Sequence, residues 1–141
     1  MSYVPMIVGM RTAADVERAY IAGLVDGEGS FCISEHQSSQ KGRWLQPCFD
    51  ISNNDELCLE YVHEMYGGTV NTVKNRGHHL RFTHPKMIKN ILEDIFPYLI
   101  VKKEAAKVML YFCESRLKRR GMAYTRNELV WCKALRIFNN R

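Results

Sequence analysis

The chain has 141 residues, 46% of them hydrophobic and 25% charged, and a formal net charge of +5 at pH 7. This length and composition predict a single globular domain with a buried core. They exclude a membrane-spanning chain, because no apolar run approaches the roughly 18 residues that a span requires. The five cysteines are an odd number without a C-x-x-C pair, which argues against a disulfide framework and a zinc site. With no secretory signal evident in residues 1–10, we expect an intracellular protein, in a prokaryotic cytoplasm or inside an organelle.

The charges are unevenly distributed along the chain. Residues 1–69 hold 4 basic and 10 acidic residues, residues 70–120 hold 12 and 4, and residues 121–141 hold 4 and 1. The three balances of −6, +8 and +3 sum to the net charge of +5. A strongly basic half predicts a surface that binds a polyanion such as nucleic acid, although many unrelated proteins share the feature.

The apolar residues alternate between helical and strand periods. A period near 3.6 predicts helices and strict alternation predicts half-buried strands, while glycine and proline mark the ends. In chain order we expect a helix over 16–25, strands over 31–36 and 44–52, a helix over 55–66, strands over 69–74 and 79–83, and helices over 85–95, 100–119 and 126–137. This order is αββαββα with an extra C-terminal helix, an α+β fold. The single domain spans 1–141, with its core at about 15–120 and a helical extension at 121–141.

The first helix has the clearest local signals. Thr12 and Asp15 have the spacing of a capping box, and Gly27 and Gly29 supply the stop. Small residues at Ala19, Gly23 and Gly27 share one face, with Ala22 and Asp26 beside them. A glycine inside a helix costs roughly 1 kcal/mol relative to alanine, so a local account of Gly23 fails. A close contact with a second helix explains it.

Two carboxylates, Asp26 and Glu28, lie between glycines at the end of this helix. Acidic groups there oppose the helix dipole by roughly 0.3–1 kcal/mol each. Hard divalent cations prefer such oxygen ligands, together with the backbone carbonyls that a turn exposes. If two copies of the helix pack face to face, two acidic clusters meet at the symmetry axis, where metal ions could hydrolyse one phosphodiester on each strand of a duplex.

The complete run Tyr20-Ile-Ala-Gly-Leu-Val-Asp-Gly-Glu-Gly-Ser-Phe31 resembles the motif of LAGLIDADG homing endonucleases. The resemblance extends over about residues 15–120. It implies an antiparallel β-saddle that lies in the DNA major groove, and metal-dependent hydrolysis that makes a site-specific double-strand break. It implies Mg²⁺ as cofactor, with Ca²⁺ supporting binding without cleavage. Because the chain carries one motif, it also implies a homodimer that cuts a long pseudo-palindromic site, with Ala19, Ala22, Gly23 and Asp26 at the interface.

The resemblance also assigns the catalytic residues. Glu28 takes the place of the metal-binding acid, often aspartate in relatives, and the Gly27 carbonyl would be a second ligand. Asn53 matches the polar residue that positions water at the end of the second strand. Lys102 matches a lysine that organises solvent and charge, with Lys103 as the alternative if the register shifts by one. Leu57 occupies a position where several relatives have an active-site arginine, so that contact is absent or supplied elsewhere.

Strand alternation predicts which residues face DNA. If the apolar faces of both hairpins cover the core, the opposite polar faces meet the duplex. A mixed face of amide, acid, thiol and arginine can read base edges, whereas a face of only Lys and Arg would contact phosphates. The expected DNA-binding residues are Ser30, Cys32, Ser34, His36, Trp44, Gln46, Cys48, Asp50, Asn71, Lys74, Arg76, His79, Arg81 and Thr83.

Two other functions fit the same features. The first alternative is a maturase that binds intron RNA and helps it fold, because the charge asymmetry would serve RNA equally well. The second is a DNA-binding regulator that has lost cleavage. An intact acidic motif argues against the second, since a protein that only binds DNA gains nothing from negative charge that faces phosphate.

Overall fold

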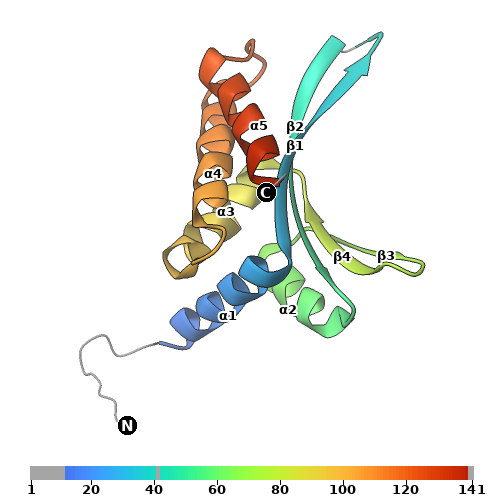
Figure 1. Cartoon of the computed structure of the whole chain (residues 1–141), viewed down its shortest axis with the longest axis vertical. Coiled ribbons are helices and arrows are strands. Elements are labelled where there is room, and N and C mark those ends of the chain that lie inside the picture. Colours follow the sequence, from blue (N-terminus) through green and yellow to red (C-terminus); the bar gives the residue numbers. More distant parts are fainter. Residues whose placement is uncertain (1–11, 41, 140–141) are drawn as a thin grey trace.

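The computed structural model describes residues 12–40 and 42–139. The elements, labelled in Figure 1, are α1 (Ala13–Glu28), β1 (Gly29–Ser38), β2 (Gly42–Asn53), α2 (Glu56–Tyr66), β3 (Thr69–Val73), β4 (Gly77–Phe82), α3 (Pro85–Ile95), a 3₁₀ turn η1 (Phe96–Tyr98), α4 (Lys103–Lys118) and α5 (Arg126–Asn139). The predicted αββαββα order with an extra C-terminal helix is confirmed. Within the described part of the chain, no helix is long and apolar enough to cross a membrane.

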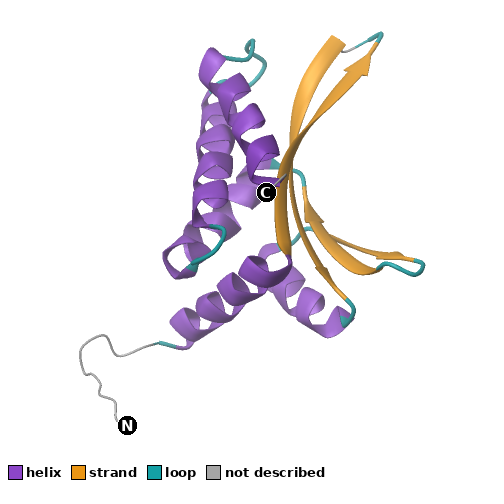
Figure 2. Cartoon of the chain, in the orientation of Figure 1, coloured by secondary structure: helices purple, strands orange, loops and turns teal. Residues whose placement is uncertain are grey.

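The four strands form one antiparallel sheet in the order β1-β2-β4-β3. The long β1–β2 hairpin extends well beyond the shorter β3–β4 hairpin, and the sheet curves between them (Figure 1). Helices α3, α4 and α5 lie on one side of the sheet, and no described helix covers the other side of the β1–β2 hairpin (Figure 2). One face of the sheet is therefore a core face and the other is open.

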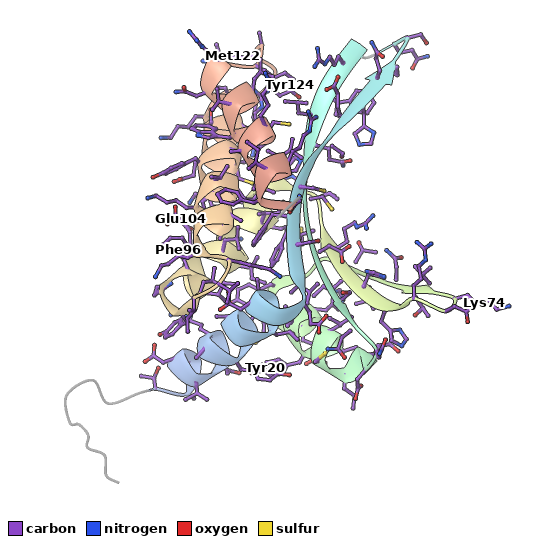
Figure 3. The ribbon with its side chains drawn as sticks, in the orientation of Figure 1. Tyr20, Lys74, Phe96, Glu104, Met122 and Tyr124 are labelled. Atoms are coloured by element: carbon purple, nitrogen blue, oxygen red, sulfur yellow. The ribbon has the colours of Figure 1, made fainter. Side chains whose placement is uncertain are left out.

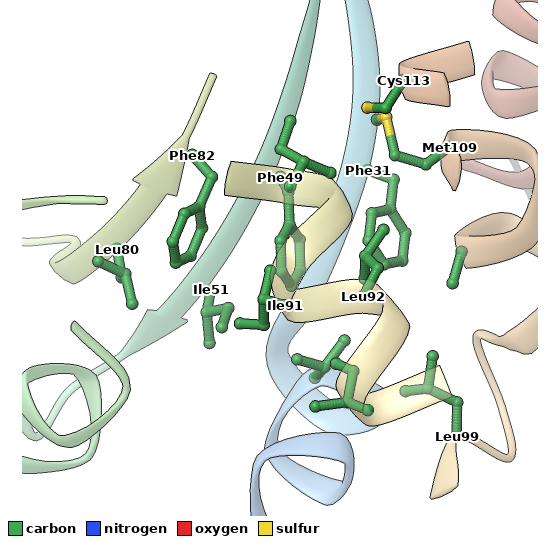
Figure 4. Close-up of a cluster of buried hydrophobic side chains, with 14 of the residues drawn as sticks. Phe31, Phe49, Ile51, Leu80, Phe82, Ile91, Leu92, Leu99, Met109 and Cys113 are labelled. Carbon is green, nitrogen blue, oxygen red and sulfur yellow. The ribbon is translucent and has the colours of Figure 1, made fainter. Parts of the chain in front are cut away.

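The core lies between the sheet and the helices. Phe31, Phe49 and Phe82 come from three neighbouring strands and stack with centroid distances of 4.8 and 5.5 Å (Figure 4). Helix α3 packs against them with Ile91 and Leu92, which are fully buried. Burial of such side chains contributes roughly 1.5–3 kcal/mol each, so this cluster orients the sheet relative to the helices.

The first helix begins as the sequence predicts. Thr12 and Asp15 form the complete capping box, in which the Thr12 side chain accepts from the Asp15 N–H and the Asp15 carboxylate accepts from the Thr12 N–H. Tyr98 donates a further hydrogen bond to Asp15 across 2.7 Å. The helix continues to Glu28, beyond the expected end at residue 25, because Gly29 enters β1 directly and its N–H bonds to the Val25 carbonyl.

The fourth helix begins three residues later than predicted. Residues 100–102 donate their backbone N–H groups to the Asp26 carboxylate at 2.8, 3.1 and 3.0 Å. This carboxylate comes from a helix more than 70 residues earlier, so apolar periodicity could not reveal it. Ile100 and Val101 are consequently 84% and 75% exposed, outside the helix.

Helix α5 closes the open end of the core. Glu128 is completely buried and accepts from the Arg116 guanidinium at 3.2 and 3.3 Å, which joins α5 to α4. The Tyr124 hydroxyl accepts from the Leu45 N–H at 2.7 Å, and the Asn139 amide donates to the Phe31 carbonyl at 2.9 Å. The C-terminal helix thus supports the long β1–β2 hairpin from its core side.

Candidate active site and nucleic-acid interface

The motif helix divides into a buried and an exposed face. Ile21, Ala22 and Val25 are fully buried against the core of the same chain, whereas Gly23 and Gly27 are exposed. The expectation that Ala22 lies at a dimer interface is therefore wrong, because its methyl group is covered within one subunit. Ala19 and Gly23 lie on the exposed face.

Asp26 has a structural use within the chain. Its two carboxylate oxygens hold the backbone of residues 100–102, as described above. The first acid of the motif therefore stabilises the backbone that leads into α4. By binding their backbone N–H groups, Asp26 also holds the exposed residues Ile100 and Val101 next to the C-terminal end of α1.

A small polar hollow lies at the end of the motif helix. Its volume is about 170 Å³, and its lining comes from the end of α1, the end of β2 and the β3–β4 turn. The lining residues are Glu28, Ser52, Asn53, Asn54 and Arg76. The structure therefore brings the predicted residues Glu28 and Asn53 together. It adds Arg76, which sequence reasoning had placed only on the DNA-facing surface.

The backbone on both sides of the hollow is closely fitted. The Asn53 side-chain oxygen accepts from the Asp55 N–H at 2.8 Å, which orients this amide at the start of α2. Gly77 has φ +77°, and a Cβ there would lie 2.8 Å from the Asn54 side-chain oxygen. Only glycine allows the β3–β4 turn to approach this closely. This turn holds Arg76 at the hollow. Within the turn, the Arg76 N–H donates to the Val73 carbonyl.

Lys102 lies beside the motif but lines a neighbouring hollow. Its ammonium donates to the carbonyl of Gly29, the residue directly after the motif helix. Lys103, the alternative in the sequence, instead places its ammonium 5.2 Å from the centre of the Phe96 ring. Of the two lysines, Lys102 is the one that contacts the motif segment.

The donor groups at the hollow suit a hard divalent cation. Glu28 offers an exposed carboxylate, and Asn53, Asn54 and Ser52 offer neutral oxygens. The Gly27 carbonyl belongs to the last turn of α1, where carbonyls have no partner within the helix. No group of three or more His, Cys, Asp or Glu side chains gathers among residues 12–40 and 42–139. One copy of these residues therefore supplies only part of a coordination shell.

The open face of the sheet carries the polar side chains that strand alternation predicted. Ser30 pairs with Asp50, Cys32 with Cys48, Ser34 with Gln46 and His36 with Trp44 across β1 and β2. The rows continue onto the second hairpin, where Asp50 pairs with Arg81, Ser52 with His79, Thr69 with Arg81 and Asn71 with His79. Thr69 belongs to this surface and was missed because its neighbours alternate weakly. Thr83 lies beyond the end of β4 and outside these rows.

Asp50 connects the side chains of Arg81 and His79 on this face. Its Oδ2 accepts from Nε of Arg81 at 2.9 Å and lies 2.9 Å from Nη2 in an ion pair, and its Oδ1 lies 3.1 Å from Nδ1 of His79. The Asp50 side chain is 13% exposed, while that of Arg81 is 52% exposed. The carboxylate therefore lies within the surface, and the guanidinium projects from it.

The paired thiols on the same face have unequal acidity. A hydrogen bond from Cys48 lowers the pKa of Cys32 to about 7, with a smaller contribution from the charge of Arg81. The same hydrogen bond raises the pKa of Cys48. Cys32 is exposed and Cys48 half-buried, so the more acidic thiol is also the more accessible one.

An apolar groove runs along the exposed side of α1 and α2. It has a volume of about 710 Å³ and is lined by Val16, Glu17, Tyr20, Leu24, Asn53, Asp55, Leu57, Cys58 and Tyr61. Val16, Tyr20 and Leu57 are 58%, 51% and 72% exposed. Tyr20 projects from α1 away from the sheet (Figure 3). Leu57 thus belongs to an apolar surface and does not line the polar hollow.

The motif, the fold and the polar hollow agree with a comparison against protein families. A sequence model of the LAGLIDADG endonucleases matches residues 21–114, more than half of the chain. The chain belongs to the LAGLIDADG endonuclease family. It is thus an endonuclease of a family that hydrolyses DNA phosphodiesters with divalent metal ions. No curated protein sequence matches the chain significantly.

Solved structures of homing endonucleases share the fold. The archaeal intron-encoded enzyme I-Vdi141I, complexed with DNA, has a TM-score of 0.73 and 21% identity, covering 87% of this chain and 84% of that one. I-CvuI, in complex with its target in the presence of calcium, has a TM-score of 0.72 and 17% identity, covering 88% and 82%. I-TnaI has a TM-score of 0.70 and 20% identity, covering 92% and 88%. Similarity at these identities establishes the shared fold.

Proposed function

We propose that this LAGLIDADG endonuclease acts as a homodimer that makes a site-specific double-strand break in a long, pseudo-palindromic DNA target. The observation that carries the proposal is the position of Glu28. Its exposed carboxylate lies at the end of the motif helix, in a polar hollow with Asn53 and Arg76. The open polar face of the sheet begins directly after it, at Ser30. The reacting phosphate can therefore reach Glu28 while the neighbouring bases meet the sheet.

Two features of α1 support the homodimer. A Cβ built on Gly23 or Gly27 would meet no atom of this chain within 4 Å. Packing within the chain therefore gives no reason for glycines that each weaken the helix by about 1 kcal/mol. Apolar side chains surround the same face, and Ile100 and Val101 extend the apolar surface near its end. A second copy of α1, packed around Gly23, explains both features, and the described residues contain one such helix.

The same packing completes the metal site. Each copy supplies one carboxylate, Glu28, and the Gly27 carbonyl. Two copies related by a two-fold axis bring these groups together, and the DNA phosphate and water provide the remaining oxygens. A bound Mg²⁺ would supply Lewis-acid activation of the phosphodiester and of water.

The remaining catalytic residues act around this centre. Asn53 orients water at the hollow through its side-chain amide, which is itself fixed by Asp55. Lys102 adds positive charge at the end of the motif helix, and its bond to Gly29 holds its ammonium there. Both roles act on charge and solvent and neither residue bonds to the substrate covalently.

The test is a cleavage selection with purified protein, magnesium and a randomised duplex library. We expect discrete double-strand cuts at one pseudo-palindromic sequence. The variant Glu28→Gln keeps the size of the side chain but removes its charge. Because loss of an outer-shell partner of a metal already costs about 10–100-fold, loss of this ligand should reduce cleavage by at least about 100-fold.

The matched measurement is duplex binding in calcium, where Glu28→Gln should still bind the selected site. Loss of binding together with cleavage would contradict a metal-ligand role for Glu28. A folded dimer that cuts no duplex would contradict the proposed function, and intron RNA would then be the substrate to test.

A further inference from the structure

We infer that Arg81 reads one guanine in each half of the DNA target, and that Asp50 is the positioning residue that holds Arg81 in the orientation this requires. The inference rests on the proposed function, because it concerns the duplex that the sheet binds. The inference names the base that is read. It also gives different roles to Asp50 and Arg81, which the sequence predicted only as DNA-binding residues.

The hydrogen bonds determine which edge of the guanidinium is free. Nε of Arg81 donates to Oδ2 of Asp50 at 2.9 Å, and Nη2 lies at ion-pair distance, also 2.9 Å, from the same oxygen. A guanidinium has five N–H groups, and Asp50 accepts from Nε, so the N–H groups of Nη1 and the Nη2 N–H on the side away from Asp50 remain available. These remaining donors lie along the edge that points away from Asp50. Parallel donors on one edge match the O6 and N7 acceptors that guanine presents in the major groove.

The same edge discriminates against the other purine. Adenine presents the N7 acceptor beside an N6 donor in the major groove. An N–H of Arg81 that faces the N6 donor would have no acceptor. Since Asp50 occupies the Nε side, Arg81 cannot turn that side toward a different base without breaking the Nε hydrogen bond and the ion pair with Asp50. The orientation of Arg81 therefore favours guanine over adenine. A contact with the phosphate charge alone would not distinguish the two bases.

Asp50 is suited to support Arg81 and not to read a base itself. Its Oδ2 is shared by two Arg81 nitrogens and its Oδ1 lies 3.1 Å from His79 Nδ1. Both carboxylate oxygens are thus occupied before DNA arrives. The Asp50 side chain is only 13% exposed, whereas 52% of Arg81 is accessible. A guanidinium that is already oriented loses less conformational entropy on binding than a free arginine does.

The position of the pair in the sheet agrees with base reading. Asp50 and Arg81 are cross-strand partners on β2 and β4, in the row that also contains Ser30 and Thr69. This row crosses all four strands of the open polar face. A homodimer would present the pair twice, so each half-site should contain one guanine at a symmetric position.

The first experiment selects bound duplexes from a randomised library in calcium, and compares the wild type with Arg81→Ala, Arg81→Lys, Asp50→Ala and Asp50→Asn. The wild type should select a motif with one invariant G·C pair in each half-site. Arg81→Ala should lose the preference at that pair alone, and Asp50→Ala should lose most of it although Arg81 remains. Asp50→Asn keeps an acceptor for Arg81 and should retain part of the preference.

Arg43→Ala is the matched control. Like Arg81, Arg43 pairs with a carboxylate, that of Glu35, at 2.6 Å. It lies on β2, the same strand as Asp50. Its odd position in the strand places it on the opposite face from Asp50. This variant removes the same charge from the protein, and its selected motif should be unchanged. Thermal melting of each variant shows that it is folded, and Arg81→Lys keeps the positive charge if Arg81→Ala does not fold.

The second experiment replaces the selected guanine with 7-deazaguanine, which lacks the N7 acceptor. This change should weaken binding of the wild type by about 5- to 150-fold, the range expected for one good base contact of 1–3 kcal/mol. It should leave binding by Arg81→Ala unchanged.

The outcomes separate the inference from the proposed function. A wild type that selects a clear motif, with Arg81→Ala selecting the same motif, overturns the role of Arg81 alone. Uniform weakening of Arg81→Ala on every sequence also overturns it, because this is the behaviour of a phosphate contact. An unaltered motif for Asp50→Ala overturns the positioning role. A wild type that selects no duplex overturns the proposed function and the inference together.

Discussion

Helices α1 and α3 have similar apolar content but very different surroundings. Helix α3 buries Ile88, Ile91, Leu92 and Ile95 completely, and its remaining face is polar. Helix α1 buries a shorter stripe and leaves Val16 and Tyr20 more than half exposed beside two uncovered glycines. Helix α3 is thus covered within one chain, whereas α1 leaves the face that we propose as the dimer interface uncovered.

The largest effect is expected from a substitution in α3, the helix that is covered within one chain. Ile91→Ala removes a fully buried side chain that packs under the phenylalanine stack, and should lower the free energy of unfolding by about 2–5 kcal/mol. The loss should be the same at every protein concentration, because the contact lies within one chain. Denaturant unfolding at two concentrations measures it. A loss that depends on concentration would show that α3 also contributes to an interface.

The next effect is expected from substitutions at Gly23 in α1, the helix with an uncovered face. Gly23→Leu should abolish the proposed dimer, because its side chain occupies the space that a second copy would need, and sedimentation should show a monomer. The matched variant Gly23→Ala should raise the stability of the monomer by up to about 1 kcal/mol, since a Cβ meets nothing within the chain. A dimer that persists in Gly23→Leu would contradict close helix packing and the contrast between α1 and α3.

The smallest effect concerns the reactivity of two thiols, one on the open face of the sheet and one in the core. Cys32 lies on the open face with a pKa of about 7, lowered by the Cys48 hydrogen bond, while burial raises the pKa of Cys113 in α4 to about 12. Since the thiolate is the reactive form, alkylation of Cys32 should rise with a midpoint near pH 7. Cys113 should not react in the folded protein over this range. Mass spectrometry of the adducts gives both rates.

The control for the thiols is Cys48→Ala. Removing the hydrogen bond should shift the Cys32 midpoint upward, toward the ordinary thiol value. An unchanged midpoint would show that Arg81 or solvent sets the acidity of Cys32, and that the cross-strand pair does not.

Local patterns predicted much of the fold. The capping box at Thr12, the strand expected over 31–36 and the two strands expected over 69–74 and 79–83 all appear close to where the sequence indicates them. Such features depend on residues within a few positions of one another. The family resemblance was also readable from one short segment, since the motif is contiguous.

The expectations that were wrong concern contacts between distant segments. The start of α4 was misplaced because Asp26 binds residues 100–102, and nothing near those residues signals a carboxylate. Ala22 was assigned to the interface because it neighbours Gly23 in the sequence. On a helix, adjacent residues point about 100° apart, and the core takes Ala22 while Gly23 remains outside.

The sequence by itself determined the helices and strands, the polar and apolar faces of the sheet, and the acidic motif, because each follows from periodicity or from neighbouring residues. Only the tertiary structure decided that Glu28, Asn53 and Arg76 share one hollow, that Lys102 contacts Gly29, and that Asp50 holds Arg81. These contacts join residues 23 to 73 positions apart. They depend on how the β3–β4 turn and the start of α4 pack against the motif helix, and on the strand register, which no local pattern encodes.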